Sequence, residues 1–248
     1  MWRIWCGALV AFVIAGCQSE PPTSPPAPSP PAAKPKPFAK ERAAMVDDQV
    51  RGRGIRDPRV LEAMRKVPRH ELVPDDVRAH AYEDRPLPIG FDVTISQPYI
   101  VAAMTEAARV QRGDRVLEVG TGSGYQAAVL AELGADVYSI EIIEPLAKRT
   151  AGDLERLGYK QIHLRIGDGY RGWPEAAPFH AIIVTAAPEK IPQPLIDQLA
   201  EGGRLVIPVG ESGDQQLKVV TRGPRGTTSE TLMDVRFVPM TGESQQQK

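Results

Sequence analysis

The stretch Glu118-Val119-Gly120-Thr121-Gly122-Ser123-Gly124 decides the fold. It ends a short apolar run, Arg115–Val119, and leads into Tyr125–Leu133, which reads as a helix closed by Gly134. Glycines at a strand-to-helix turn let the backbone approach a ligand closely, at the carboxyl edge where open α/β sheets bind ligands. The stretch therefore predicts an α/β fold with a ligand site at the end of its first strand.

Strands and helices alternate along the rest of the body. We predict further strands and helices over Asp136–Ile140, Pro145–Leu157, Ile162–Ile166, His180–Thr185, Pro192–Leu199 and Arg204–Val209. The continuous apolar run Ala181-Ile182-Ile183-Val184 is typical of a parallel sheet covered on both faces. Leu217–Thr221 and Thr231–Val238 alternate more clearly and are expected to form an antiparallel pair. The fold class is α/β: a doubly wound, mostly parallel sheet with an antiparallel C-terminal pair.

Helices are also predicted before this sheet. Lys40–Gly52 has helical character, and a second helix is expected to begin at Pro58, because proline favours the first helical position. Prolines break the following region, up to Gly90, into short pieces.

The glycine stretch also indicates the ligand. A dinucleotide site is usually built on G-x-G-x-x-G, whereas this chain has G-x-G-x-G with Glu118 two positions before the first glycine. S-adenosylmethionine has no phosphate and carries a positive sulfonium and a positive ammonium. An acidic residue at this edge therefore suits that methyl donor better than a pyrophosphate.

Two further acidic residues follow predicted strands. Glu141, about 20 residues on, is expected to accept hydrogen bonds from ribose hydroxyls, which fits NAD as well as the methyl donor. Asp168 lies in Gly167-Asp168-Gly169 and either accepts a hydrogen bond from an adenine amino group or forms a plain Asx turn.

Several motifs, in this order, resemble those of the protein-L-isoaspartate O-methyltransferases. They are Leu87–Gly90, Thr94–Tyr99, Val116–Gln126, Ile182–Ala187 and Arg236–Thr241, the last resembling the family's C-terminal strand. The resemblance runs from about Phe38 to Thr241. It implies a Rossmann-like methyltransferase domain over residues 38–248 that transfers a methyl group from S-adenosylmethionine to the free carboxylate of L-isoaspartyl residues in damaged proteins or peptides.

The same resemblance implies the site residues. The family's active-site serine corresponds to Ser96, which we interpret as a hydrogen-bond donor that orients the substrate carboxylate and not as a covalent nucleophile. Thr241 is expected beside the donor and the substrate. The full set expected to bind S-adenosylmethionine is Val93, Thr94, Ile95, Ser96, Glu118, Gly120, Thr121, Gly122, Ser123, Gly124, Glu141, Asp168, Gly169 and Thr241.

Three other functions remain open on sequence alone. An NAD-dependent oxidoreductase is disfavoured by the G-x-G-x-G loop and by the absence of a hydride-transfer acid/base pair. A small-molecule methyltransferase is disfavoured by the Thr94–Pro98 motif. A catalytically inactive, lipid-anchored binding protein is conceivable, because a donor made in the cytoplasm is not obviously available outside it.

The N-terminus predicts export. One positive charge precedes an apolar run, Ile4–Gly16, of 13 residues, short of the roughly 20 that cross a bilayer. Ile14-Ala15-Gly16-Cys17 resembles a bacterial lipobox, so residues 1–16 are expected to be a signal peptide and Cys17 the lipidated residue. At the position after Cys17 the chain has Gln18 and not aspartate, which resembles lipoproteins sent to the outer membrane of a Gram-negative cell. This predicts a lipid-anchored protein on the periplasmic face of the outer membrane. A chance cysteine is the alternative.

A proline-rich segment follows. Nine of the seventeen residues from Pro21 to Pro37 are proline, so residues 17–37 are predicted to be an extended tether, with a docking ligand as the alternative. A true start at Met45 would instead give a cytoplasmic protein.

Composition limits the remaining partners. The chain has a net charge of −1, so neither nucleic acid nor an anionic membrane surface is expected to bind it by charge. Both cysteines, Cys6 and Cys17, precede the body, and the four histidines are scattered, so no metal site is predicted. We expect a monomer.

Overall fold

A seven-stranded sheet lies at the centre of the body in this computed structural model, which describes residues 1–2 and 38–246. The predicted signal peptide, lipidation site and tether fall, apart from Met1 and Trp2, outside the described residues. The strand order is β5-β4-β3-β6-β7-β8-β9. In chain order the strands are β3 Arg115–Val119, β4 Asp136–Glu141, β5 His163–Ile166, β6 Phe179–Val184, β7 Leu199–Glu211, β8 Asp214–Gly223 and β9 Gly226–Val235.

The predicted doubly wound sheet is confirmed. Strands β5, β4, β3, β6 and β7 pair in parallel, and β8 and β9 continue the sheet as an antiparallel pair. The chain moves outward from β3 to β5 and then returns to β6 on the other side of β3. In open α/β sheets the ligand crevice lies at such a switch point, outside the carboxyl ends of the strands.

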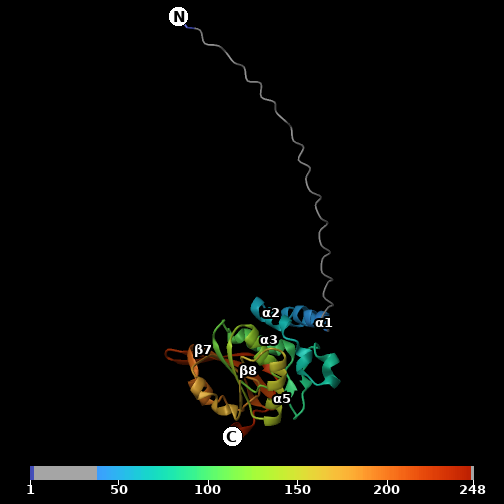
Figure 1. Cartoon of the computed structure of the whole chain (residues 1–248). Helices are drawn as coiled ribbons and strands as arrows, with labels where there is room; N and C mark the ends of the chain where they lie inside the picture. The colour runs from blue at the N-terminus through green and yellow to red at the C-terminus, as the bar shows by residue number, and fades with distance from the viewer. Residues whose placement is uncertain (3–37, 247–248) are drawn as a thin grey trace. The chain divides into compact units, whose positions relative to one another are not determined.

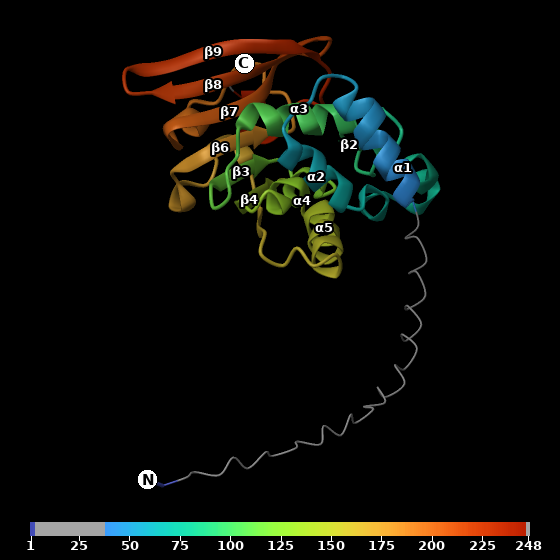
Figure 2. The same ribbon diagram turned by 90° about the horizontal axis from the view of Figure 1, so that it is seen from above.

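Each face of the sheet carries its own apolar core. The first core joins alternate residues of the central strands, such as Val116 and Ile183, to the helices α2 Pro58–Lys66, α3 Pro98–Ala108 and α4 Tyr125–Glu132. These helices lie together on one side of the strands in Figure 2. The core on the opposite face joins the alternate strand residues that point the other way, such as Leu117 and Ile182, to segments that connect the strands, through residues such as Ala176 and Leu195.

The connections on the second face are shorter. They include η4 Gly169–Arg171, η5 Pro174–Ala176 and α6 Gln193–Asp197, while α5 Glu144–Arg156 packs with the first core. The helix predicted over 192–199 is thus shorter than expected, because Leu199 already begins β7.

The region before the sheet forms short pieces, as the prolines predict. α1 Ala39–Ala44, labelled with α2 in Figure 1, continues into a π-helical segment η1 Met45–Arg51. Two 3₁₀ turns, η2 Arg69–Leu72 and η3 Asp75–His80, follow α2. β1 Leu87–Pro88 and β2 Thr94–Ile95 then pair as a small antiparallel ladder. None of the helices among the described residues is long and apolar enough to cross a membrane.

Helix α3 was not predicted from the sequence. Its eleven residues are largely alanine and apolar, and seven of them are buried, so they show no amphipathic periodicity. Its position matters because it begins at Pro98, two residues after Ser96.

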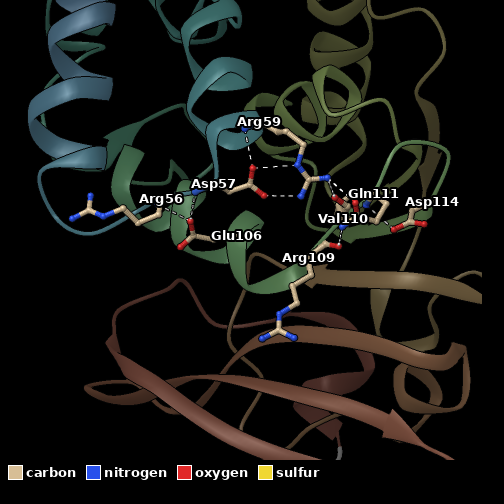
Figure 3. Close-up of polar contacts among 8 residues, drawn as sticks. All are labelled: Arg56, Asp57, Arg59, Glu106, Arg109, Val110, Gln111 and Asp114. Carbon is tan, nitrogen blue, oxygen red and sulfur yellow. Dashed lines mark hydrogen bonds and ion pairs between the residues drawn. The ribbon is translucent and has the colours of Figure 1, made fainter.

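Polar contacts fix the far end of α3 to the start of α2 (Figure 3). The Glu106 carboxylate accepts hydrogen bonds from the backbone N–H groups of Arg56 and Asp57, both at 2.7 Å. Asp57 caps α2, and Arg59 binds the Asp57 carboxylate and donates to the carbonyl of Val110 at 3.1 Å. The two helices therefore support each other and hold α3 over the sheet.

The C-terminal segment differs from the prediction. The strand predicted over 231–238 ends at Val235, so the interpretation of Arg236–Thr241 as strand is wrong. This segment, which we call the strap, contacts the sheet through Ala187: its N–H donates to Val238 at 2.9 Å, and Met240 donates to its carbonyl at 2.8 Å. Because the strap bonds across the end of β6, it cannot also continue the β8–β9 ladder.

Candidate active site

The glycine loop folds tightly over the end of β4. The N–H groups of Gly120 and Thr121 both donate to the carbonyl of Ile140, at 2.8 and 3.2 Å. Gly120 has φ +94°, and a Cβ built there would lie 2.4 Å from Oγ1 of Thr185. That hydroxyl donates to the carbonyl of Gly120 at 2.6 Å, so only glycine fits between the loop and β6.

Gly124 serves helix packing. It has φ +80°, and a Cβ built on it would lie 2.9 Å from Thr150 and 3.1 Å from Leu154, both on α5. The third glycine of the motif therefore lets α4 begin against α5. It does not line the pocket described below.

Glu141 joins the loop to the next turn. Its two carboxylate oxygens accept hydrogen bonds from the backbone N–H groups of Gly122, at 2.8 Å, and Ile143, at 3.0 Å. The side chain is buried, with 5% of its surface exposed. A carboxylate oxygen has two lone pairs, so each oxygen retains one acceptor position for a ligand hydroxyl.

Glu118 lies beneath the loop and is fully buried. Its Oε2 accepts a short hydrogen bond from Ser139, whose hydroxyl also contacts that of Thr121 at 2.6 Å. Burial raises the pKa of the Glu118 carboxyl to about 8, against the opposing effect of the Ser139 hydrogen bond. Among the described residues its Oε1 has no partner. A cationic ligand near this carboxylate would favour its charged form.

A pocket of about 330 Å³ opens above the loop. Seven of the predicted residues line it: Val93, Thr94, Gly120, Gly122, Glu141, Gly169 and Thr241. Five more, Ile95, Ser96, Glu118, Thr121 and Ser123, line an adjoining cavity of about 40 Å³ behind the loop. A Cβ on Gly122 would make ordinary van der Waals contact with Ile89, at 3.8 Å, and would not collide with it. The pocket and the adjoining cavity thus present glycine backbone and carboxyl groups to a ligand. These groups suit an uncharged ribose and a cationic group.

Asp168 forms the plain turn that the sequence left open. Its Oδ1 accepts from the N–H of Tyr170 at 2.9 Å, and its Oδ2 from the N–H of Glu243 at 2.7 Å. Its side chain does not line the pocket, whereas the neighbouring Gly169 does. Asp168 therefore fixes the C-terminal turn η6, Gly242–Gln246, below the strap.

Sequence reasoning missed several lining residues. Thr185 and Ala186 follow β6, Ile140 and Ile142 flank the end of β4, and Met240 belongs to the strap. The first four lie at carboxyl ends of strands next to the switch point, which is a signal that the strand predictions already contained.

A larger groove of about 750 Å³ adjoins the pocket. Ser96 and the start of α3 form one wall, and the ends of β8 and β9 with the strap form the other. Thr94, Thr185 and Val238 line both the groove and the pocket. Ser96 forms no side-chain hydrogen bond with any residue that the structure describes, so its hydroxyl is available to a ligand in the groove.

Fold and site together define a class of protein. An open α/β sheet with a carboxylate-bearing pocket at its switch point, joined to a second groove, is the arrangement of a Rossmann-like methyltransferase with a cationic donor. The comparisons with known proteins agree. Residues 40–245 match the family model for protein-L-isoaspartate(D-aspartate) O-methyltransferase.

Individual relatives carry the same name. A protein-L-isoaspartate O-methyltransferase of Gloeobacter violaceus is 60% identical over 204 residues, which cover 82% of this chain and 100% of the relative. One from Opitutus terrae is 62% identical, covering 82% of this chain and 88% of the relative.

Solved structures agree as well. One named protein-L-isoaspartate O-methyltransferase superposes with a TM-score of 0.75 at 27% identity, covering 82% of this chain and 66% of that chain. A Plasmodium falciparum protein, named as such an enzyme in complex with S-adenosyl-L-homocysteine, gives 0.72 at 26% identity, covering 81% of this chain and 98% of that chain.

The chain therefore belongs to the protein-L-isoaspartate(D-aspartate) O-methyltransferase family. This confirms the resemblance drawn from the motifs. The protein is an S-adenosylmethionine-dependent methyltransferase of protein isoaspartyl residues.

Proposed function

We propose that methyl transfer takes place where the pocket meets the groove, with S-adenosylmethionine in the pocket and the isoaspartyl segment in the groove. The observation that carries this proposal is that Thr94, Thr185 and Val238 line both spaces. An open groove supports a peptide substrate over a small molecule, and the intact glycine loop and carboxylates speak against an inactive binding protein.

Methyl transfer to a carboxylate requires no acid or base catalysis from the protein. S-adenosylmethionine supplies an electrophilic methyl group on its sulfonium when bound. A free substrate carboxylate has a pKa of about 4, so it is already ionised at neutral pH and needs no general base. The residues of the junction would instead act by orienting the acceptor oxygen toward the methyl group. Ser96 donates a hydrogen bond to the other carboxylate oxygen and fixes its orientation.

Glu141 and Glu118 hold the donor. Glu141 offers its remaining acceptor positions to the ribose hydroxyls while it keeps the loop and the next turn in place. Glu118, whose pKa burial raises to about 8, lies under the loop, where a bound sulfonium or ammonium would favour its charged form. Asp168 contributes through the position of Gly169 and the C-terminal turn.

A methylation assay tests the overall proposal. The purified protein, given S-adenosylmethionine with a labelled methyl group, should form a methyl ester on an isoaspartyl peptide and none on the same peptide with normal aspartate. Equal labelling of both peptides would refute the substrate assignment.

Replacement of Glu141 should weaken donor binding. We expect Glu141→Ala to cost about 1–3 kcal/mol of binding free energy, because ribose hydroxyls and two backbone N–H groups lose a charged acceptor. Calorimetry with S-adenosylmethionine measures this. Glu144→Ala is the matched control, since Glu144 begins α5 on the surface and pairs with Lys148. Unchanged affinity in Glu141→Ala would remove Glu141 from the donor site.

We also propose that the protein is exported and lipid-anchored at Cys17, and that it acts as a monomer. The lipobox-like Ile14–Cys17 and the proline tether support export, and both lie outside residues 40–245 of the family match. The pocket and the groove are built within one chain, which supports a monomer.

Substitution of Cys17 tests the anchor. Cys17→Ser is expected to abolish labelled palmitate incorporation, because serine lacks the sulfur that carries the proposed lipid. The protein should then leave the membrane fraction, since stable anchoring needs two or more acyl chains. Cys6→Ser is the control and should leave labelling unchanged. Wild-type protein that takes up no label and begins at Met45 in the cytosol would contradict the export proposal.

A further inference from the structure

Gln215 holds the strap by its side chain. It is the second residue of β8 and pairs with Val235, the last residue of β9. Just past this pair its Oε1 accepts from the N–H of Phe237 at 2.6 Å, and its Nε2 donates to the carbonyl of Phe237 at 3.2 Å. One amide thus satisfies both backbone groups of a residue that has left the ladder.

This contact is buried. Gln215 is 4% exposed and faces the same side of the sheet as Leu217 and Val219, which belong to the core under α3. A glutamine at this depth is costly unless both ends of its amide are bonded, and here both are. Its neighbour Gln216 points to the other face and lines neither the pocket nor the groove.

The residue that Gln215 holds lies at the transfer point. Phe237 lines the groove, and the adjacent Val238 lines both the groove and the donor pocket, opposite Thr94 and Thr185. In the described part of the chain, backbone bonds also hold the strap near Val238: Ala187 N–H donates to the carbonyl of Val238, and Met240 N–H donates to the carbonyl of Ala187. The position of the strap side of the junction depends on these bonds together with the Gln215 contact.

We propose that Gln215 is a positioning residue for methyl transfer, which sets the place of Val238 at the junction by fixing the backbone of Phe237. This inference rests on the proposed assignment of the groove and the pocket. A displacement of about 1 Å at a reacting centre is enough to lower a rate by about 100-fold, even when the change originates away from the chemistry. Gln215 itself also lines the groove. Because both ends of its amide are bonded to the backbone of Phe237, we place its effect on the reacting atoms through the strap.

Two substitutions separate positioning from stability. Gln215→Met keeps the length of the side chain but makes neither bond, and Gln215→Glu keeps the acceptor for Phe237 N–H while losing the donor. We expect kcat on an isoaspartyl peptide to fall about tenfold in Gln215→Met and less in Gln215→Glu, with the Kd for S-adenosylmethionine within about threefold of wild type. Gln216→Met is the matched control and should leave both constants unchanged.

The measurements are kcat, peptide KM, donor Kd and melting temperature on the full chain, with the folded fraction determined for each variant. A kcat per folded molecule equal to wild type in both Gln215 variants, whatever their melting temperatures, overturns the proposal and leaves Gln215 a stabilising residue only. A Kd raised more than tenfold overturns it as well. Failure of the proposed function is seen separately, because wild type would then not methylate the isoaspartyl peptide at all.

Discussion

Gly120→Ala is expected to lower the affinity for S-adenosylmethionine by about 100-fold. Gly120 has φ +94°, a conformation that costs a residue with a side chain about 1–3 kcal/mol. The added methyl group would also lie 2.4 Å from Oγ1 of Thr185, a hydroxyl held by its bonds to the carbonyls of Gly120 and Val119. The loop must therefore move, and with it the floor of the donor pocket.

Calorimetry and thermal unfolding measure the two parts of this effect. Gly152→Ala is the control: Gly152 lies within α5 with open space around it, so alanine there should stabilise the protein by about 0.5–1 kcal/mol. Combining Gly120→Ala with Thr185→Ala removes the collision but not the backbone strain. The double variant should bind better than the sum of the two single changes predicts. If the binding free energies of the two single changes simply add in the double variant, the loss of affinity does not come from the collision with Thr185.

The fold could be predicted because its signals are local. The strands around the glycine loop are short apolar runs separated by glycine-closed helices, so their positions along the chain and their parallel pairing follow from the sequence pattern. The same reasoning missed α3, whose residues are apolar on nearly every side because it packs between the sheet and α2. A helix buried all round shows no periodicity to detect.

The C-terminal error has a similar cause. Thr231–Val238 alternates like a strand, yet the ladder ends at Val235 because the strap bonds to Ala187 and Gln215 instead. Those contacts join residues far apart in the chain, and no short-range pattern reveals them.

The site was predicted more completely on one side than on the other. Glu118, Glu141 and the glycines come from strand ends at the switch point, which the sequence marks. Thr185 also lies at the end of a predicted strand, whereas Val238 reaches the same place through tertiary packing of the strap. Asp168 shows the limit of residue chemistry alone: of the adenine contact and the plain turn that the sequence left open, the structure shows the turn, and the side chain does not line the pocket.

Loss of the Ser96 hydroxyl is expected to lower turnover without loss of donor binding. Ser96→Ala should reduce kcat on an isoaspartyl peptide by about 100-fold, because a misoriented acceptor carboxylate no longer attacks in line. The donor Kd should stay within about threefold, since Ser96 lines the groove and the small cavity behind the loop but not the larger donor pocket. Its hydroxyl has no side-chain partner in the described part of the chain, so its removal leaves no protein group unpaired.

Single-turnover kinetics and calorimetry test this split directly. Ser229→Ala is the control, because Ser229 is exposed on β9 and lies in neither space. Ser96→Thr keeps the hydroxyl and adds a methyl group, so it should retain more activity than Ser96→Ala if donation to the carboxylate is what matters. Wild-type kcat in Ser96→Ala would exclude the hydroxyl from the reaction. A tenfold higher Kd for S-adenosylmethionine with unchanged kcat would instead make Ser96 part of the donor site. The acceptor carboxylate would then have to be oriented by Thr94, Thr185 and the strap alone.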